Sequence, residues 1–379
     1  MINKHSLQED AEILAHFGED YAEQLGAVIP PIYMTSLHVK PKEYLYAPNH
    51  MPFTYGRVSN PTANLFERKI AALERAEMAL SFASGMAAIS SSILANLQQG
   101  DHIVAVDFAY GPTREFITED LSKFGIEYTF VPGKNLSDFA EAIRPNTRLF
   151  YLESPSTAVF HIQNLREVAV LAKKHGIVTL IDNSWASPIF QKPIELGIDI
   201  SIHSATKYIG GHSDVIAGVA AGRTEIMNKV KHIRENFGGI LSPMDAWLCI
   251  RGLRTLLVRL GAHQEAALEI AARLSQHPAV RKVYYPGLPD FPQHQLAKSQ
   301  MSGFTGLLSF SLHGGREEAR AVASRLRWFN LGPSWGGFES MVNLLDGEEG
   351  DKVVRIHVGL EGVETLWADL KGSLDAVLG

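Results

Sequence analysis

A lone lysine follows a short apolar-alternating run in the stretch SIHSATKYIGGHSD, residues 201–214. Two hydroxyl residues, Ser204 and Thr206, stand just before this lysine, Lys207. A lysine among apolar neighbours loses part of its solvation, which lowers the pKa of its amine and makes it a better nucleophile. The two hydroxyl groups could hold a phosphate. An amine beside a phosphate site suits binding of pyridoxal phosphate as a Schiff base, whereas a single lysine after a strand can also be an ordinary surface residue.

Two further positions could bind the other charged parts of such a cofactor. In FASGMAAIS, residues 82–90, Ser84 and Gly85 stand where an apolar run gives way to a helical one. Free N–H groups at a helix N-terminus attract anions, although small residues are also common at turns. Asp182 ends the apolar run IVTLIDN, where a carboxylate needs a partner. A protonated pyridine nitrogen is one such partner, and an aspartate that caps the following turn is the alternative.

An aromatic residue and a late arginine complete the ordered set. Tyr110, in VDFAYGPT, could stack on a cofactor ring or simply pack. Arg355 alternates with apolar residues in VVRIHVGLE. It could bind a substrate carboxylate through two hydrogen bonds, or it could be a charge at a strand edge. Each signal is modest alone, and their order along the chain gives them weight.

Composition excludes several other classes. The 379 residues are enough for two domains, and the net charge of −6 gives no reason to expect a nucleic-acid surface. The single cysteine, Cys249, excludes an internal disulfide. None of the 15 histidines falls in a metal-ligand pattern, so no metal is expected. A polar, acidic N-terminus and the absence of an apolar run of about 18 residues predict a cytoplasmic protein without a membrane span.

Short apolar runs alternate with helical stretches between about residues 60 and 243. The runs are residues 78–84, 101–107, 126–132, 147–154, 177–183 and 198–204, and the helical stretches include 63–76, 86–98, 113–124 and 165–176. This alternation predicts an α/β fold with a mostly parallel sheet covered by helices on both faces. Chemistry in such sheets sits at the C-terminal ends of the strands. The candidate positions fall at those ends: Ser84-Gly85, Tyr110, Glu153-Ser154, Asp182-Asn183 and Ser204 to Lys207.

Residues 1–59 are predicted to form a long, irregular arm. Prolines break this segment repeatedly, so it cannot build its own core and is expected to lie on another surface, such as a second subunit. The arm ends in TYGRVSNPT, where Tyr55 and Arg57 stand two apart and therefore point to one side of an extended backbone.

The rest of the chain is predicted to divide into two α/β domains. Residues 60–243 contain the parallel sheet, and a long helical run over residues 242–274 connects it to the second domain. The second domain, residues 244–379, is smaller, with strands expected in VRKVYYPG, GLLSFSL and KVVRIHVGL.

These motifs resemble those of the Cys/Met-metabolism family of pyridoxal-phosphate enzymes, which has the aspartate-aminotransferase-like fold (fold type I). The matching motifs, found between about residues 26 and 362, are YGRVSNPT, SGMAA, ESPS, DNSWASP, SATKYIGGHSD, DAWLCIRGLRTLLVR, SWGGFES and RIHVGLE. The resemblance implies a pyridoxal 5'-phosphate cofactor and a small sulfur-containing amino-acid substrate. It also implies a homotetramer, built as a dimer of dimers with shared active sites.

The resemblance further implies which residues hold the cofactor. Lys207 is catalytic and forms the Schiff base, Asp182 pairs with the pyridine nitrogen, and Tyr110 stacks on the ring and takes part in catalysis. The phosphate is held within one subunit by backbone and hydroxyl groups, those of Gly85, Met86, Ser204 and Thr206.

Substrate and neighbour contacts are implied in the same way. Tyr55 and Arg57 reach the phosphate of the neighbouring subunit, and Tyr55 assists the first proton transfer there. Arg355 takes the α-carboxylate of the substrate. Ser334 and Trp335 lie in the substrate pocket.

Within the family, two features favour a carbon–sulfur β-lyase similar to cystathionine β-lyase. Ser334-Trp335 stands where synthases and γ-lyases usually carry Ser-Leu. Tyr110-Gly111-Pro112 stands where methionine γ-lyases tend to place a cysteine after the glycine. Val58 is a departure, because β-lyases often have a second arginine there for the far end of cystathionine. Arg114 or Glu115 could then contact the distal amino-acid group.

The expected reaction cleaves cystathionine, or a related thio-amino acid, to a thiol such as homocysteine, pyruvate and ammonia. γ-Elimination or γ-replacement, as in cystathionine γ-lyase, methionine γ-lyase or cystathionine γ-synthase, is the first alternative. An aminotransferase is another. A non-enzyme that keeps the fold would be expected to lack at least one of Lys207, Asp182 and Arg355, and all three are present.

Overall fold

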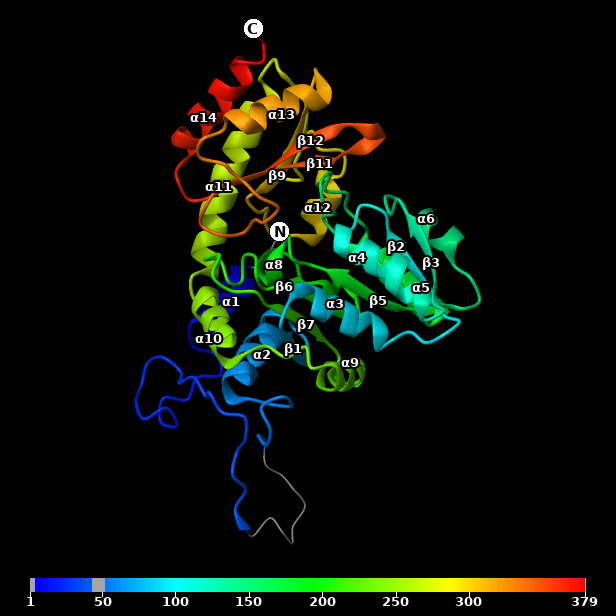
Figure 1. The fold of residues 1–379 in the computed structure, drawn as a ribbon, viewed down its shortest axis with the longest axis vertical. Helices are drawn as coiled ribbons and strands as arrows, with labels where there is room; N and C mark the ends of the chain where they lie inside the picture. Colours follow the sequence, from blue (N-terminus) through cyan, green and yellow to red (C-terminus); the bar gives the residue numbers. More distant parts are fainter. Residues whose placement is uncertain (1–3, 43–51, 379) are drawn as a thin grey trace.

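Two β-sheets organise the chain, which a computed structural model describes over residues 4–42 and 52–378 (Figure 1). The larger sheet has the order β1-β7-β6-β5-β4-β2-β3. Its strands are β1 (Met78–Phe82), β2 (His102–Val106), β3 (Glu127–Val131), β4 (Thr147–Glu153), β5 (Val178–Asp182), β6 (Ile200–Ser204) and β7 (Gly218–Gly222). All neighbouring pairs from β6 to β3 are parallel, so the predicted mostly parallel sheet is confirmed.

The strands expected from apolar runs are all present in this sheet, with ends that differ by at most two residues. Strand β7 has no counterpart among those predictions. Its sequence, GVAAG, has a single β-branched residue, Val219, among glycines and alanines, and so lacks the pattern that marks a strand. It lies antiparallel between β1 and β6.

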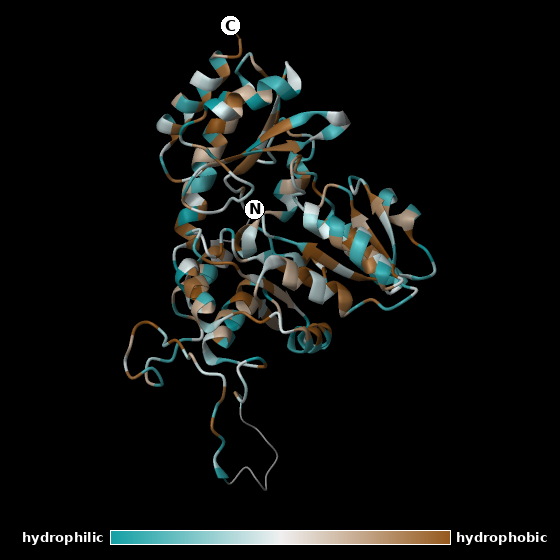
Figure 2. Ribbon diagram, in the orientation of Figure 1, coloured by the Kyte–Doolittle hydropathy of each residue, from teal (hydrophilic) through white to brown (hydrophobic). Residues whose placement is uncertain are grey.

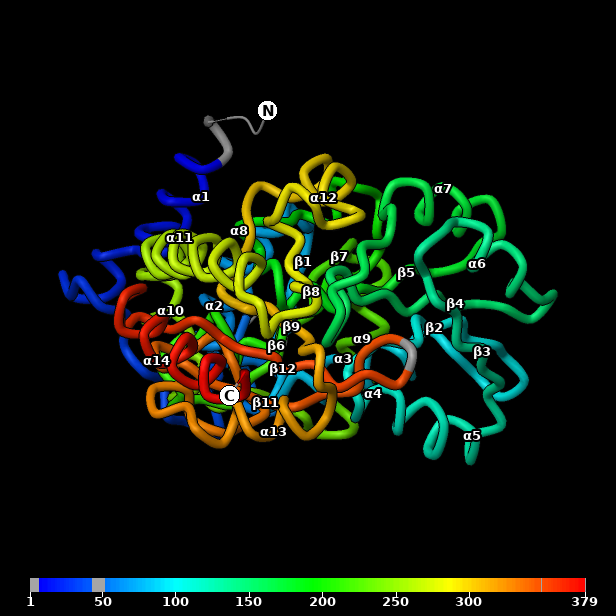
Figure 3. Tube along the Cα trace, turned by 90° about the horizontal axis from the view of Figure 1, so that it is seen from above, coloured from blue at the N-terminus to red at the C-terminus, as the bar shows by residue number. Residues whose placement is uncertain are grey.

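Helices cover both faces of the larger sheet, as Figures 1 and 3 show. They are α2 (Pro61–Glu74), α3 (Gly85–Leu94), α4 (Gly111–Glu115), the π-helical turn η2 (Phe116–Asp120), α5 (Leu121–Lys123), α6 (Leu136–Ala142), α7 (Leu165–His175), α8 (Ser187–Phe190), the 3₁₀ turn η3 (Pro193–Leu196) and α9 (Thr224–Phe237). Asn60 caps the start of α2, because its side chain accepts hydrogen bonds from the N–H groups of Thr62 and Ala63. Helix α7 ends where Gly176 adopts a left-handed conformation.

The apolar side chains of the larger sheet form its core. Leu149, Phe150, Tyr151 and Leu152 of β4 are all fully buried, although they point alternately to opposite faces. A strand covered on both faces reads as a continuous apolar run, which explains why the sequence revealed β4 readily. Figure 2 shows the same strands as a hydrophobic band inside more polar helices.

The N-terminal arm is only partly irregular. Residues within it form helix α1 (Lys4–His16), whereas the sequence predicted no regular element there. Asp10 of this helix is buried and pairs with Arg75 and Lys192, so ion pairs anchor α1 to the rest of the same chain. The part of the arm in residues 43–51 lies outside the described residues. Beyond α1, an isolated bridge joins Leu37 to Tyr55.

The C-terminal part holds the second sheet, in the order β10-β11-β12-β9-β8. Its strands are β8 (Val280–Tyr284), β9 (Leu307–Leu312), β10 (Asn330–Leu331), β11 (Met341–Asp346) and β12 (Lys352–His357). The helical elements here are α10 (Pro243–Leu253), α11 (Leu256–Ser275), α12 (His294–Gln300), α13 (Gly315–Arg325), the 3₁₀ turn η4 (Glu348–Gly350) and α14 (Val363–Asp375). Figure 1 shows α11 running from the larger sheet up to this second unit.

The single helical run predicted over residues 242–274 is two helices. Helix α10 ends at Leu253 and α11 begins at Leu256. A Cβ atom at Gly252 would lie 2.2 Å from the carbonyl oxygen of Ile209, so α10 packs directly on the turn that follows β6. The domain boundary between residues 243 and 244 stays a prediction. No helix in the described ranges is long and apolar enough to cross a membrane.

Candidate active site

Lys207 stands in a tight turn just after β6, at the C-terminal edge of the larger sheet. Its backbone N–H donates to the carbonyl of Ser204 at 3.1 Å, and its own carbonyl accepts from the N–H of Gly211 at 2.8 Å. The turn aims the side chain at the second unit, where Nζ lies 2.9 Å from Oγ of Ser334. The same amine lies 5.3 Å from the centroid of the Trp335 ring. The two units therefore meet at this lysine.

The surroundings of Lys207 disfavour its charged form. Burial lowers the pKa of the amine to about 8, and the positive charge of Arg355 contributes in the same direction. The negative charge of Asp182 opposes this shift. A substantial fraction of the amine is therefore neutral slightly above neutral pH, as a nucleophile or base requires.

Strand β7 brings the predicted anion-binding turn, Ser84-Gly85, next to β6, the strand that precedes Lys207. Gly218 pairs with Phe82 of β1 on one side and with Ser204 of β6 on the other. Because β7 is antiparallel to both, the C-terminal ends of β1 and β6 lie at the same edge. A Cβ atom at Gly218 would lie 2.1 Å from the carbonyl oxygen of Ser84, so only glycine permits this approach.

The N-terminus of α3 has the features of an anion site. Oγ of Ser84 accepts from the N–H of Ala87 at 3.0 Å, which caps the helix. The N–H groups of Gly85 and Met86 belong to the first turn, where no helical carbonyl is available to them. A Cβ atom at Gly85 would lie 3.0 Å from Oγ of Ser204, so the glycine keeps the backbone open beside that hydroxyl.

The other predicted hydroxyl, that of Thr206, already has backbone partners. It donates to the carbonyl of Ala217 at 3.1 Å and accepts from the N–H of the same residue at 3.0 Å. These bonds join the lysine turn to the segment that leads into β7. The Thr206 hydroxyl proton is thus used within the fold.

Two carboxyl groups lie side by side at the ends of β4 and β5. Glu153 pairs in register with Asp182, which in turn accepts from the N–H of Ser184 at 2.9 Å. Burial raises the pKa of Asp182, and burial together with the charge of Asp182 raises the pKa of Glu153 to about 8. The charge of Asp182 disfavours ionisation of Glu153, and a cation placed at this edge would stabilise both carboxylates.

Glu153 was a strand-end candidate with no assigned role, and the structure gives it one. Its Oε2 accepts from the N–H of Tyr110 at 2.7 Å, and its Oε1 accepts from the N–H and hydroxyl of Thr157 at 2.6 and 2.5 Å. The carboxyl group therefore fixes the start of α4, where the Tyr110 side chain is 46% exposed at the surface of the site.

Arg355 reaches the site from β12 of the second sheet. Its side chain is buried, and Nη2 donates to the carbonyl of Pro333 at 2.8 Å. Burial lowers its pKa to about 10, and the nearby Glu153 opposes this shift. The guanidinium still carries its charge at neutral pH, and its bond to Pro333 places it beside Ser334, the residue that bonds Lys207.

The sequence as a whole matches a known family. A model of the family described as "Cys/Met metabolism PLP-dependent enzyme" matches residues 11–375. The chain belongs to this family. Its members depend on pyridoxal phosphate, and the predicted fold type I is confirmed by a solved structure. The crystal structure of metB from Corynebacterium glutamicum superposes with a TM-score of 0.92, at 34% identity over 97% of this chain and 98% of that one.

Relatives of this chain carry the names of different activities. A cystathionine gamma-lyase of Bacillus subtilis (strain 168) is 38% identical over 96% of this chain and 99% of the relative. A cystathionine beta-lyase of Lactococcus lactis subsp. cremoris (strain MG1363) is also 38% identical, over 95% of this chain and 97% of the relative. Overall identity therefore does not separate the β-lyase from the γ-lyase reaction.

The strand-end residues fit the cofactor of this Cys/Met-metabolism family. Gly85 leaves a space beside Ser204 that a side chain would fill, at a helix N-terminus suited to a phosphate. The Asp182 carboxyl lies at a partly buried edge where it needs a cation, and Lys207 supplies an amine of lowered pKa. These are the three chemical groups that pyridoxal phosphate requires.

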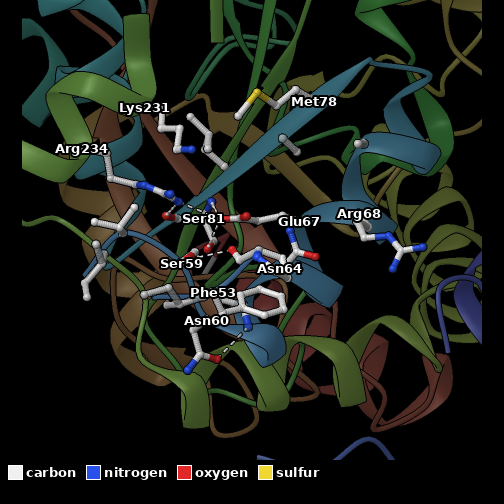
Figure 4. A pocket seen from close by; sticks show the side chains of 18 of the residues that line it. Phe53, Ser59, Asn60, Asn64, Glu67, Arg68, Met78, Ser81, Lys231 and Arg234 are labelled. Atoms are coloured by element: carbon white, nitrogen blue, oxygen red, sulfur yellow. Dashed lines mark hydrogen bonds and ion pairs between the residues drawn. The ribbon is translucent and has the colours of Figure 1, made fainter. Parts of the chain in front are cut away.

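Tyr55 and Arg57 belong to a different part of the chain's surface from this cleft. Tyr55 is 46% exposed, and the Arg57 guanidinium packs 5.5 Å from its ring centroid while donating to the carbonyl of Glu235. Arg57 lines a cavity of about 290 Å³ between the arm, α2, β1 and α9, part of which Figure 4 shows. Among the described residues, the lining of this cavity includes neither Lys207 nor Asp182.

The residues considered for the distal end of the substrate have other contacts. Arg114 donates to the carbonyl of Asp107 at 2.5 Å and lies 4.9 Å from the Phe130 ring centroid. Glu115 is exposed on α4. Val58, which stands in place of the second arginine, lines the arm cavity.

No cluster of acidic, histidine or cysteine side chains within the ranges the structure describes could hold a metal ion. His203, next to the lysine strand, has a structural partner instead. Its Nε2 lies 2.5 Å from Oε1 of Glu74, and both side chains are buried.

Proposed function

We propose that this chain is a pyridoxal-phosphate-dependent carbon–sulfur β-lyase that cleaves cystathionine or a related thio-amino acid. The observation that carries the proposal is the position of Trp335, whose ring lies 5.3 Å from the Lys207 amine while Ser334 bonds the same amine. β-Elimination needs one proton removed, at the α-carbon. γ-Elimination needs a second proton removed at the β-carbon, which requires more freedom for the base. A lysine amine restrained by the Ser334 hydroxyl and the Trp335 indole suits the single proton removal of β-elimination.

The cofactor would be held by residues at the strand ends. Lys207 would carry it through its amine, Asp182 would face the pyridine nitrogen, and the Tyr110 ring would lie against the cofactor ring. The first-turn amides of Gly85 and Met86 would face the phosphate. Of the two hydroxyls, we propose a direct phosphate contact for Ser204, because the Thr206 hydroxyl already donates its proton to the carbonyl of Ala217. When bound, the cofactor serves as the electron sink for the charge that forms at the α-carbon.

The remaining steps belong to this chain's own side chains. Arg355 binds the α-carboxylate of the substrate with its charged guanidinium. Neutral Lys207 Nζ then takes the α-proton, which the pKa of about 8 permits near physiological pH. The carbon–sulfur bond breaks with its electron pair on sulfur, and the thiolate takes a proton. The three-carbon fragment leaves as pyruvate and ammonia after uptake of one water.

The arm suggests how the site is completed in an assembly. Leu25, Val28 and Val39 are 98%, 74% and 86% exposed, which is unfavourable for apolar side chains in water. We propose that this segment packs on a second copy in a homotetramer. Tyr55 and Arg57 would then reach the neighbour's phosphate, and Tyr55 would assist its first proton transfer.

A γ-lyase is the second candidate. Val58 supports it, because the arginine that often holds the far end of cystathionine in β-lyases is missing there. Relatives of both kinds resemble the chain equally in overall identity.

Product analysis separates the two candidates. Purified protein is incubated with L-cystathionine, and the keto acid and thiol are chromatographed. Pyruvate with homocysteine is the expected pair. 2-Oxobutyrate with cysteine would replace the β-lyase proposal by the γ-lyase one. If neither pair forms while the absorption band at about 420 nm is present, the protein binds the cofactor but cystathionine is not its substrate.

A further inference from the structure

A buried histidine at the end of β12 bonds the turn that faces the lysine. His357 is 1% exposed, and it points to the same face of β12 as Arg355, two residues earlier. Its Nε2 lies 3.1 Å from the carbonyl oxygen of Gly337. A carbonyl oxygen can only accept, so Nε2 must carry the proton and donate.

The turn that contains Gly337 touches Lys207 in two places. Gly336 has a φ of +86°, and a Cβ atom there would lie 2.8 Å from the backbone nitrogen of Tyr208 and 3.1 Å from Cα of Lys207. Ser334, at the start of the turn, bonds the Lys207 amine at 2.9 Å. Any shift of the turn therefore changes the surroundings of the amine directly.

Tyr208 links this turn to a pair of buried histidines. Its ring centroid lies 5.5 Å from that of Trp335, 5.8 Å from that of His357 and 5.6 Å from that of His263. The two imidazole rings are 4.9 Å apart. Rings packed this closely leave His357 little freedom to rotate, so its N–H stays aimed at one carbonyl.

The histidine remains a neutral donor over the working range of pH. Burial lowers the pKa of His357 to about 3, and the neighbouring His263, Lys207 and Arg355 contribute to this lowering. Burial also lowers the pKa of His263 to about 4. The neutral ring has one N–H, and the Gly337 carbonyl fixes which nitrogen bears it.

We propose that His357 is a positioning residue, which holds the 334–337 turn against Lys207 so that Ser334 and Trp335 stay at the amine. The imidazole touches neither substrate nor cofactor in this role, and it acts through the carbonyl of Gly337. The inference rests on the proposed function of Lys207, and it adds a residue to which the sequence pointed only as part of RIHVGLE.

The test compares His357→Phe with His357→Gln. Phenylalanine keeps a ring in the cluster and removes the donor, whereas glutamine keeps an N–H donor at a similar reach. We expect His357→Phe to lower kcat about 10- to 100-fold with little change in KM, because the base is displaced while Arg355 still binds substrate. His357→Gln should restore most of the loss.

A second readout does not depend on the reaction. The pKa of Lys207 is measured in the cofactor-free full-length protein from the pH dependence of amine labelling, followed by mass spectrometry of the peptide. In His357→Phe the turn loosens and water reaches the amine, so the pKa should rise from about 8 toward the ordinary 10.5. Gly336→Ala, which pushes the turn away but keeps the histidine, should give the same rise.

A matched control is His294→Phe. His294 is also a buried histidine that bonds a backbone carbonyl, that of Pro286 at 2.8 Å, and it lies in α12. It should lower the melting temperature without moving the pKa of Lys207. An unchanged pKa in both His357→Phe and Gly336→Ala would overturn the positioning role. A wild-type protein that shows no absorption band at about 420 nm with the cofactor would instead reject the proposed function. The labelling experiment would still decide the role of His357.

Discussion

The lysine cleft and the N-terminal arm differ in how far a single chain completes them. In the cleft, Glu153 accepts three hydrogen bonds and Lys207 has both a hydroxyl and an indole beside it. In the arm, Tyr55 is half exposed and Leu25 is almost fully exposed. The cleft is thus prepared by its own chain, and the arm presents groups whose burial would require another surface.

This difference follows from how each region is built. The cleft lies at the ends of strands whose positions are fixed by backbone pairing and by a buried apolar core. The arm has α1 as its anchor, and the segment between α1 and α2 has little regular structure in the described residues. If the arm completes a neighbour's site, mutations in the two regions should complement each other, whereas mutations within the cleft should not.

The largest expected effect is at Lys207. Lys207→Arg keeps the positive charge but removes an amine that can lose its proton, since arginine stays charged. Keto-acid release should fall at least about 1,000-fold, and the about 420 nm band should disappear. Lys231→Arg on α9 is the matched control and should retain both. Activity within tenfold of wild type would remove Lys207 from the proposed mechanism.

A mixed-subunit experiment tests whether the arm, unlike the cleft, serves the site of a neighbouring chain. Arg57→Ala alone should weaken cofactor binding about tenfold or more, because a charged hydrogen bond to the phosphate is lost. Coexpression with Lys207→Arg creates dimers in which one site has its own Lys207 and the partner's Arg57. At a cofactor concentration too low to load the Arg57→Ala parent, random pairing in a symmetric dimer with shared sites should return about a quarter of wild-type activity.

The control for this experiment is Arg68→Ala, which lies in the same cavity on α2 and packs 5.9 Å from the Phe17 ring centroid. It should bind the cofactor as the wild type does. If the mixed protein shows no more activity than the sum of its parents, the arm does not serve a neighbouring site.

The pH dependence of cofactor uptake tests the electrostatic coupling between Arg355 and Lys207. Arg355 lowers the pKa of the Lys207 amine, so Arg355→Gln removes a cation and should raise that pKa above about 8. Uptake of pyridoxal phosphate by the cofactor-free protein requires the neutral amine, so the uptake rate follows the neutral fraction. That rate should rise with pH through about 8 in the wild type and at higher pH in the variant. A midpoint that stays in place or moves to lower pH would contradict the coupling.

The smallest expected effect concerns the helix cap in the cleft. Ser84→Ala removes the acceptor for the Ala87 N–H and should lower the free energy of unfolding by about 1 kcal/mol. Urea denaturation measures this change. Ser90→Ala, on the same helix away from the cap, should alter stability by no more than a few tenths of a kcal/mol. Equal effects of the two substitutions would mean that the cap contributes nothing special.

The sequence revealed most strands of the larger sheet because buried parallel strands are continuous apolar runs, as in β4 and β5. It did not reveal β7, whose glycines and alanines carry no such pattern. It also merged α10 and α11, since both helices are apolar and no proline or glycine separates Leu253 from Leu256. Helix α1 was missed because the arm was judged by its prolines, which begin at Pro30, whereas residues 4–16 contain none.

By itself, the sequence determined the chemical inventory and its order: an anion turn, an aromatic ring, a strand-end acid, a lysine and a late arginine. Tertiary structure decided which of these meet. Gly218 brings Ser84 to Ser204, the second sheet carries Arg355 and Ser334 to Lys207, and Tyr55 remains outside. The physical reason is that residue types and local patterns fix which groups can react. Distances between them depend on strand pairing and close packing across the whole chain, which no local stretch encodes.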